Sequence, residues 1–336
     1  MSAPPSQRPL RIVLPGGSGH VGQMLARYFQ ERGHFVTVLT RGPYTAPWQT
    51  VHWDGKQTGP WVETLEGADV CINLAGRSVN CRFNFENRRE IYESRIGTTR
   101  LLNRVVVSLD RPPRVWMNAS TANIYRHAPG WPVDERPMDE ATGELGGNEL
   151  ISKRRRAPET WNFSVRVAKD WEQAFFAVPT PRTRKLALRS AIVFIPVPGG
   201  AFATFSRLVR VGLGGSQGSG RQFVSWIHET DFARALEFLL DHEEVDGPIN
   251  IAAPYPLPNR EFMQTLRDAW EMPNCIPLPR PLLEIGTFLM RTESELVLKS
   301  RRVVPARLLQ AGFNFHFPNW QEAAEDLVRQ TRNRKG

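Results

Sequence analysis

The amino-acid sequence predicts a doubly wound parallel α/β sheet with a smaller, mainly helical C-terminal lobe. Three observations predict this fold class. Short apolar runs alternate with amphipathic stretches of helical length, which is the pattern of repeated strand–helix–strand units. Residues 69–74 form a nearly continuous apolar run, as expected for a strand that is buried on both faces. A glycine-rich turn separates the first apolar run from the first amphipathic stretch.

The glycine-rich turn follows the first predicted strand, residues 11–14, and precedes a predicted helix over residues 21–32. Gly16, Gly19 and Gly22 are spaced as Gly-x-x-Gly-x-x-Gly. Glycines let a phosphate approach the backbone, and the N-terminus of the following helix offers free N–H groups and a positive dipole end. A second strand, expected over residues 34–40, completes the unit. The motif therefore predicts a Rossmann-type fold that binds a dinucleotide.

The end of the second strand distinguishes between the two nicotinamide dinucleotides. An acidic residue here would bind the ribose hydroxyls of NAD, but this strand ends in Thr40 and Arg41. A hydroxyl and a guanidinium suit a 2′-phosphate, because arginine binds phosphate through charge-assisted hydrogen bonds. The sequence therefore predicts NADP (NADPH) as the cofactor. The alternative is that Arg41 is an ordinary loop arginine.

Further strands and helices continue the alternation along the chain. Strands are expected over residues 51–54, 69–74, 115–119, 185–194, 223–227 and 248–251. Helices are expected over residues 61–67, 84–107, 161–176, 202–211, 228–240, 260–270, 282–289, 293–298, 306–310 and 320–330. From this order we expect an NADP-binding domain over residues 10–195, completed by about residues 223–252. Residues 196–222 and 253–332 are expected to form the C-terminal, substrate-side lobe.

The composition indicates a globular, cytoplasmic protein. Hydrophobic residues make up 41% of the 336 residues, and no apolar run reaches the ~18–20 residues of a membrane helix. Residues 1–9 lack the apolar core of a signal peptide, and the three cysteines form no Cys-x-x-Cys motif. The net charge of +9 is spread over scattered basic residues and small clusters, at residues 153–156, 182–185 and 299–302. No nucleic-acid-binding motif accompanies them, so we interpret the charge as solvated surface that also attracts a phosphorylated cofactor.

The chain resembles the extended short-chain dehydrogenase/reductases. The glycine motif, Leu74-Ala75-Gly76 and the Ser120-Thr121 pair after the fifth strand carry this resemblance. Within that superfamily the chain is most similar to the "epimerase family" branch of the NAD-dependent epimerase/dehydratase group. The stretches that support this branch are residues 72–76, 94–95, 170–172, 188–193, 212–215, 218–220, 226–228, 247–250, 253–254, 259–262, 304–305 and 312–313. Residues 134–158 depart from the branch, with a basic loop at 149–159 that we interpret as solvated; an active-site lid is the alternative.

The resemblance also implies which residues contact the cofactor. They are Gly16, Gly17, Ser18, Gly19, His20, Val21 and Gly22 at the pyrophosphate, Thr40 and Arg41 at the 2′-phosphate, Leu74, Ala75 and Gly76 beside the adenosine and ribose, Glu90 and Arg95 lining the same cleft, and Val193 near the nicotinamide. On sequence alone, Glu90 and Arg95 are equally consistent with an ion pair on the helix surface.

The usual catalytic pair of the superfamily is absent. That pair is a tyrosine followed four residues later by a lysine, which lowers the tyrosine pKa so that the phenol can exchange a proton with the substrate. None of the five tyrosines is followed by lysine at this spacing. Lys169 lies one residue from the expected position, which rotates its side chain by roughly 100° around the helix.

Other residues are therefore the candidates for catalysis and substrate binding. The resemblance places Ser120 or Thr121 where a hydroxyl contacts the substrate, and we favour Thr121; Tyr125 is expected to act as proton donor or to pack at the strand end. Arg221 and His228 are candidates for binding the substrate; the alternative for His228 is a capping or core role.

No cluster has metal-ligand spacing, so no metal is expected. The sequence predicts an NADP(H)-binding oxidoreductase or epimerase-like protein for a small anionic or sugar-like substrate. The alternative function is a non-catalytic, NADP(H)-binding redox sensor or regulatory protein.

Overall fold

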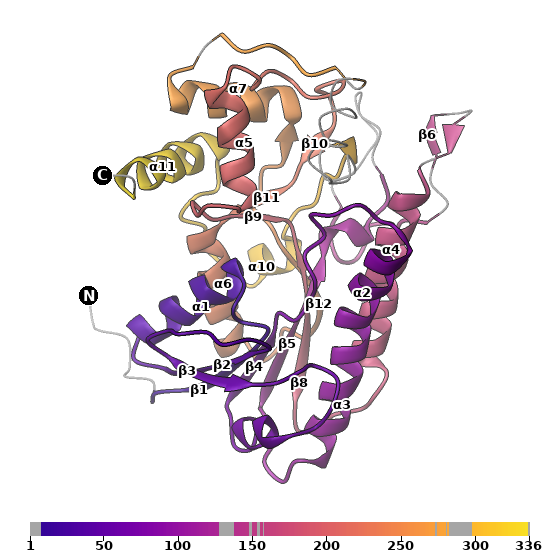
Figure 1. The fold of residues 1–336 in the computed structure, drawn as a ribbon, viewed down its shortest axis with the longest axis vertical. Helices are drawn as coiled ribbons and strands as arrows, with labels where there is room; N and C mark the ends of the chain where they lie inside the picture. The colour runs from indigo at the N-terminus through magenta and orange to yellow at the C-terminus, as the bar shows by residue number, and fades with distance from the viewer. Residues whose placement is uncertain are drawn as a thin grey trace.

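A parallel sheet of seven strands forms the centre of the computed structural model, in the order β12-β8-β5-β4-β1-β2-β3 (Figure 1). The structure describes residues 8–127, 138–147, 150–152, 155–156, 158–272, 274–279, 281 and 298–334. The strands are β1 (Arg11–Pro15), β2 (Phe35–Thr40), β3 (Gln49–His52), β4 (Val70–Asn73), β5 (Val115–Thr121), β8 (Arg184–Ser190) and β12 (Gly247–Ile251). This sheet confirms the predicted fold class.

Helices cover both faces of the sheet (Figure 1). Helices α1 (His20–Glu31) and α6 (Glu229–Asp241) bury apolar side chains such as Leu25 and Leu236 on one face. Helix α3 (Thr98–Ser108) packs on the other face through Leu101 and Leu102. Helix α4 (Glu159–Phe176) runs beside α3, and its Phe175 joins the same apolar cluster. The helices therefore exclude water from both faces of the sheet, as its apolar strands require.

The predicted helix over residues 84–107 is interrupted by a π turn. Helix α2 (Phe85–Tyr92) begins after Asn84, whose side chain accepts a hydrogen bond from the Asn87 N–H. Residues Glu93–Gly97 form the π turn, and α3 follows directly. A π turn places one extra residue in the helix and is frequent at functional sites. Here it contains Arg95, one of the predicted cofactor residues.

The second lobe is built from small sheets and three packed helices. The predicted strand over 185–194 is divided, because β8 ends at Ser190 and a separate strand β9 (Ile192–Phe194) follows. Strand β9 pairs with β11 (Trp226–His228), and β10 (Phe223–Val224) pairs with β13 (Leu257–Pro258). The predicted strand over 223–227 therefore belongs to these small sheets and not to the central one.

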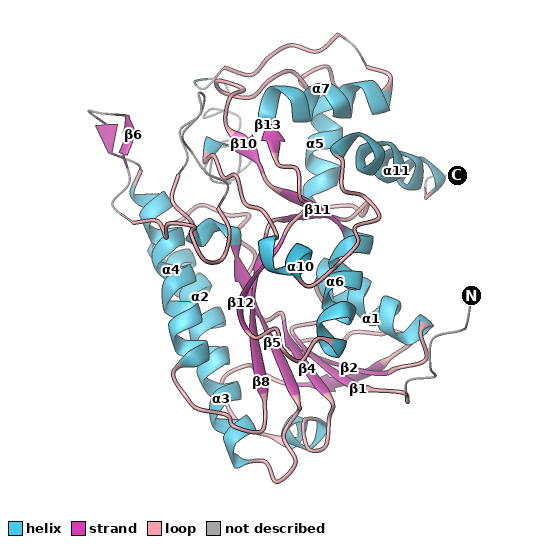
Figure 2. Cartoon of the chain, turned by 180° about the vertical axis from the view of Figure 1, so that it is seen from behind, coloured by secondary structure: helices cyan, strands magenta, loops and turns pink. Residues whose placement is uncertain are grey.

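Aromatic packing holds the helices of this lobe together. Helices α5 (Ala201–Arg210), α7 (Asn259–Trp270) and α11 (Trp320–Asn333) share one apolar cluster. At its centre the rings of Phe262 and Trp320 stack with centroids 4.3 Å apart. Helix α10 (Ala306–Gln310) matches its predicted range and lies beside β12, on the side of the molecule shown in Figure 2.

Four segments considered from the sequence lie partly or wholly outside the described residues. These are residues 1–9, the helices expected over 282–289 and 293–298, and the basic loop 149–159. Of that loop the structure describes strands β6 (Leu150–Ser152) and β7 (Arg155–Arg156), which pair antiparallel and project from the end of α4 (Figure 2).

Candidate functional site

The glycine turn after β1 is tightly packed except at one position. Gly16 has a φ of +74°, and a Cβ atom there would lie 2.6 Å from the Cα of Ala75. A Cβ on Gly22 would overlap the backbone of Gly17. A Cβ on Gly19, by contrast, would meet no atom within 4 Å. The turn thus packs closely on its neighbours, whereas space remains around Gly19, the residue that precedes helix α1.

The loop after β4 lies directly beside this turn. Leu74 donates its N–H to the Pro15 carbonyl oxygen at 2.8 Å, and Ala75 donates its N–H to Asn73 Oδ1 at 3.1 Å. The Asn73 side chain is buried and donates to Asn118 Oδ1 at 2.7 Å. The chain order of the sheet reverses between β1 and β4, and crevices at such points are where open α/β sheets bind ligands. The structure therefore brings the turn and the predicted residues Leu74 and Ala75 together at this switch point, which by that rule is the crevice where a ligand would bind.

The end of β2 offers a hydroxyl and a cation. Thr40 is buried, and its Oγ1 donates to the Gly42 carbonyl oxygen at 3.5 Å. Arg41 is exposed, and within the described part of the chain its guanidinium forms no ion pair or hydrogen bond. Its charge is therefore available to an anionic ligand.

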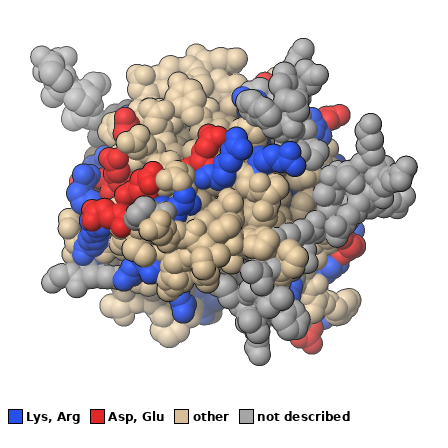
Figure 3. Space-filling model, turned by 90° about the horizontal axis from the view of Figure 1, so that it is seen from above, with Lys and Arg blue, Asp and Glu red and all other residues tan. Residues whose placement is uncertain are grey.

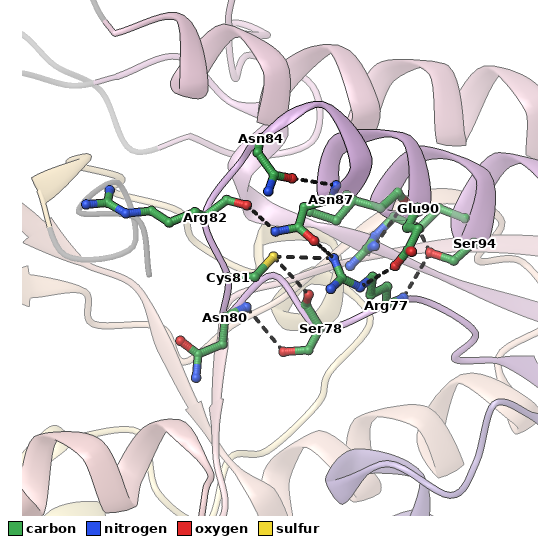
Figure 4. A network of polar contacts seen from close by, with 11 residues as sticks. Arg77, Ser78, Asn80, Cys81, Arg82, Asn84, Asn87, Glu90 and Ser94 are labelled. Atoms are coloured by element: carbon green, nitrogen blue, oxygen red, sulfur yellow. Dashed lines mark hydrogen bonds and ion pairs between the residues drawn. The ribbon is translucent and has the colours of Figure 1, made fainter. Parts of the chain in front are cut away.

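A network of polar contacts fixes the loop after β4 onto helix α2 (Figure 4). Arg77 is at its centre: Arg77 Nε lies 2.7 Å from Glu90 Oε2, and Nη1 donates to Asn87 Oδ1 at 2.6 Å. The Arg77 N–H donates to Ser94 Oγ in the π turn at 2.9 Å. Glu90 is thus paired with Arg77 and not with Arg95, so the helix-surface pair considered from the sequence does not form.

Arg95 is a desolvated cation beside the same loop. Its Nη1 donates to the Ile91 carbonyl oxygen at 3.1 Å, and its Cζ lies 5.3 Å from the centre of the Trp171 ring. A Cβ on Gly76 would lie 3.2 Å from that Cζ, so the glycine leaves room for the guanidinium. Burial lowers the pKa of Arg95 to about 10. No carboxylate among the described residues pairs with it, which leaves a positive charge next to the crevice.

A cavity of about 180 Å³ opens at the carboxyl ends of β5 and β8. Apolar and polar side chains line it: Val79, Thr121, Ala122, Asn123, Ser190, Ala191, Ile192, Phe205, Phe223, Val224, Ser225, Asn259, Lys299 and Arg301. Thr121 is the last residue of β5, and its Oγ1 accepts a hydrogen bond from the Asn123 N–H at 3.1 Å. Strand β5 is the neighbour of β4 in the sheet, so the cavity and the glycine crevice share one edge.

Two cations from the C-terminal segment reach this cavity. Lys299 and Arg301 are 2% and 8% exposed, although the sequence suggested that the cluster at 299–302 is solvated surface. Lys299 Nζ donates to the Asn123 carbonyl oxygen at 3.2 Å. The neighbouring His127 is affected by both cations: burial, and then the charges of Arg301 and Lys299, lower its pKa to about 4.

Ser120 and Tyr125 lie in a buried network and do not line the cavity. Ser120 Oγ donates to Glu172 Oε1 at 2.6 Å, and Glu172 forms a buried ion pair with Arg189 at 2.7 Å. Arg189 Nη1 donates to the Tyr125 hydroxyl at 3.0 Å, which in turn donates to Asn250 Oδ1 at 2.8 Å. Burial raises the pKa of Tyr125. Of the three predicted catalytic residues, only Thr121 faces the cavity.

The predicted substrate residues Arg221 and His228 also lie outside the lining of the cavity. His228 is fully buried, and its Nδ1 accepts the Thr230 N–H at 3.1 Å as the cap of α6. Burial lowers its pKa to about 4. Arg221 is exposed, and Val193 pairs with Ile227 in the small sheet. The cations at the cavity are instead Lys299 and Arg301; the basic run at 299–302 was the only sequence signal for them.

Opposite charges lie side by side on one face of the protein. On the face shown in Figure 3, Lys and Arg side chains lie next to Asp and Glu side chains. Among the described residues no helix is long and apolar enough to cross a membrane. The same part of the chain contains no cluster of His, Cys, Asp or Glu that could hold a metal ion.

Comparison with known proteins identifies the family. Residues 12–146 match the NAD dependent epimerase/dehydratase family, and human epimerase family protein SDR39U1 is 30% identical over 324 residues, covering 95% of this chain and 100% of that protein. The chain belongs to this family. A second family member, Staphylococcus epidermidis SERP0438, is 28% identical over 319 residues, covering 95% of this chain and 99% of its own. Residues 278–327 match a domain of unknown function, DUF1731.

Solved structures of family members have the same fold. The crystal structure of human epimerase family protein SDR39U1 (isoform 2) with NADPH has a TM-score of 0.80 and 29% identity, covering 95% of this chain and 99% of that one. A nucleoside-diphosphate sugar epimerase from Corynebacterium glutamicum has a TM-score of 0.71 and 25% identity, covering 97% of this chain and 61% of that one. These comparisons confirm the resemblance to the epimerase family branch of the extended short-chain dehydrogenase/reductases.

Proposed function

We propose that the chain binds NADP(H) in the crevice between β1 and β4. The closely packed turn and the open position at Gly19 leave space for a pyrophosphate at the N-terminus of α1, where helix N–H groups favour an anion. The exposed Arg41 guanidinium at the end of β2, which forms no ion pair with a described residue, suits the 2′-phosphate. The similar human protein was crystallised with NADPH, which supports the same cofactor here.

We further propose that the chain is an oxidoreductase or epimerase-like enzyme whose substrate enters the cavity beside Thr121. NADPH supplies a hydride from its nicotinamide when it is bound. The proposal rests on the position of Thr121, the one predicted catalytic residue that lines the cavity. Thr121 ends strand β5, which lies next to β4 at the sheet edge that carries the glycine crevice. A substrate in the cavity would therefore lie next to the cofactor.

Thr121 is suited to hold a substrate oxygen. Its Oγ1 accepts the Asn123 N–H, and among the described residues its O–H has no acceptor. The other hydroxyls of the lining have partners: Ser190 Oγ donates to the Leu188 carbonyl oxygen at 3.3 Å, and Ser225 Oγ donates to the Arg301 carbonyl oxygen at 2.8 Å. Thr121 would thus donate a hydrogen bond to the carbonyl oxygen of the substrate.

The test is NADPH oxidation in the presence of a panel of small carbonyl compounds. We expect at least one compound to be reduced, and Thr121→Val to lower kcat/KM by roughly 10²-fold while leaving NADPH affinity unchanged. Thr142→Val is the matched control, because Thr142 is exposed and is not part of the lining. Tight NADPH binding without any turnover, together with a partner protein in pull-downs, would instead support the redox sensor.

A further inference from the structure

We propose that the side-chain amide of Asn123 binds a second oxygen of the substrate, so that the cavity takes a small carbonyl compound with a hydroxyl or carbonyl group on the neighbouring carbon. The inference rests on the proposed function and names the substrate class of that same cavity. Thr121 holds the reacting carbonyl oxygen, and Asn123 adds the contact that distinguishes this class from simple ketones and aldehydes.

The first support is that the Asn123 amide lines the cavity without a partner. The hydrogen bonds of this residue run through its backbone, and among the described residues its side-chain amide forms none. An amide has one oxygen that accepts and an NH₂ group that donates. It can therefore donate to a carbonyl oxygen, or both donate to and accept from one hydroxyl group. A ligand oxygen at this wall would satisfy the amide.

The second support is that the backbone of Asn123 is held on both sides. Its N–H donates to Thr121 Oγ1 at 3.1 Å, and its carbonyl oxygen accepts a hydrogen bond from Lys299 Nζ at 3.2 Å. Asn123 lies in the short 3₁₀ turn η3 (Ala122–Ile124), which directly follows β5. The turn therefore presents the Asn123 side chain from a fixed position. Because Thr121 Oγ1 lies next to the Asn123 backbone, one small molecule can contact both side chains.

The third support is that the other neutral polar side chains of the lining are engaged elsewhere. Asn259 Oδ1 accepts the Gln217 N–H at 2.8 Å, and Asn259 Nδ2 donates to Gln217 Oε1 at 3.1 Å. The two serine hydroxyls of the lining donate to backbone carbonyl oxygens. Within the described ranges, the hydroxyl hydrogen of Thr121 and the amide of Asn123 are thus the neutral groups left for a ligand.

The size of the cavity limits the rest of the compound. Its volume of about 180 Å³ is below the roughly 300–1,000 Å³ of clefts for drug-sized ligands, so the substrate is small. Ile192, Phe205 and Val224 provide an apolar wall for its carbon atoms. α-Hydroxy ketones and α-dicarbonyl compounds carry two oxygens on adjacent carbons and little else. Such compounds match two polar groups that start from one short turn.

The experiment compares hydroxyacetone with acetone, a pair that differs by one hydroxyl group. NADPH oxidation is measured with each ketone for the wild type, Asn123→Leu and Asn314→Leu. Leucine has nearly the shape of asparagine without its polar atoms. Asn314 is exposed and lies outside the lining, so Asn314→Leu is the matched control. We expect the wild type and the control to prefer hydroxyacetone in kcat/KM by the same factor, and Asn123→Leu to lower that factor roughly tenfold.

The ratio of the two ketones separates the contact from their intrinsic reactivity, because each protein is compared with itself. A ratio that is the same in all three proteins overturns the proposal. The absence of NADPH oxidation with either ketone in the wild type refutes the reductase function for these compounds, and the binding of hydroxyacetone is then decided by crystallography.

Wild-type crystals soaked in hydroxyacetone and NADP⁺ provide that measurement, which depends neither on turnover nor on the folding of a variant. One oxygen of the compound should lie within about 3.5 Å of the Asn123 amide and the other within the same distance of Thr121 Oγ1. A cavity without the compound, or a compound whose hydroxyl group points away from Asn123, contradicts the assignment whether or not the chain is a reductase. NADP⁺ in the same crystals tests the cofactor proposal separately.

Discussion

Lys299 Nζ donates a hydrogen bond of 3.2 Å to the backbone oxygen of Asn123, although the two residues are separated by 176 positions in the chain. Asn123 follows Thr121 at the end of β5, in the part of the fold that forms the central sheet. Lys299 belongs to the C-terminal domain. The bond therefore connects the two parts of the chain at the cavity, which is lined by residues from both parts.

Adding a methyl group at Gly22 should disrupt the glycine turn, whereas Gly19 should tolerate it. The Cβ of Gly22→Ala would overlap the Gly17 backbone, and such overpacking costs roughly 1–3 kcal/mol. The Cβ of Gly19→Ala meets no atom within 4 Å. We expect urea denaturation to show lower stability for Gly22→Ala only, and NADPH binding to be weakened in both variants. A stable Gly22→Ala protein would contradict the tight packing of the turn.

Arg41→Ala should weaken NADPH binding and leave NADH binding unchanged. Hydrogen bonds to charged groups contribute about 1.5–3 kcal/mol, so we expect an NADPH affinity roughly 10- to 150-fold lower. Fluorescence titration with both cofactors measures the difference, with the exposed Arg221→Ala as control. An equal loss for NADPH and NADH would show that Arg41 does not contact the 2′-phosphate.

Glu172→Gln should strongly destabilise the fold. It leaves Arg189, whose side chain is 7% exposed, as a buried cation without its counter-charge, and breaking a buried pair in this way costs about 3–5 kcal/mol. The matched control is Glu243→Gln, since the Arg114–Glu243 pair is exposed and should contribute less than about 1 kcal/mol. Chemical denaturation of both variants checks the prediction, and similar losses would refute it.

Acidification should destabilise the protein through His127 and His228. Burial lowers the pKa of each to about 4 in the folded state, from 6.5. As pH falls from 7 to 5, each of these histidines therefore takes up a proton in the unfolded chain but not in the folded chain. The free energy of unfolding falls by about 2 kcal/mol per histidine. Glu229 acts in the opposite direction, because burial raises its pKa to about 7.

The histidine contribution can be isolated by substitution. His228→Gln should reduce the difference in unfolding free energy between pH 7 and pH 5 by about 2 kcal/mol, measured by urea denaturation. His52→Gln, at an exposed position, is the control and should leave that difference unchanged. An unchanged difference in His228→Gln would mean that the ring is protonated in the folded state.

Local patterns predicted the sheet and the glycine turn well, because their signals depend on residues close together in sequence. The run at 69–74 is apolar because both faces of β4 are covered, and Gly16 is required where Ala75 comes close. The interruption of the helix after Tyr92 was not predictable, since it depends on how the π turn meets the loop after β4.

The burial of the two cavity cations, by contrast, could not be predicted from local patterns. Lys299 and Arg301 belong to a basic run that, considered alone, is typical of solvated surface. Their burial arises only because the segment bonds to Phe223 and Ser225, which lie more than seventy residues earlier. No periodicity or composition records such a long-range pairing, so the polar side of the site becomes visible only in three dimensions.

The attachment of residues 299–303 to β10 also affects when the site forms during synthesis. Contacts between residues far apart in sequence form slowly, because a long loop must close first. A ribosome synthesises residues 299–303 after the strands that carry the glycine turn and Thr121. The glycine crevice can thus assemble on the nascent chain, whereas the cavity is complete only after residues 299–303 have emerged.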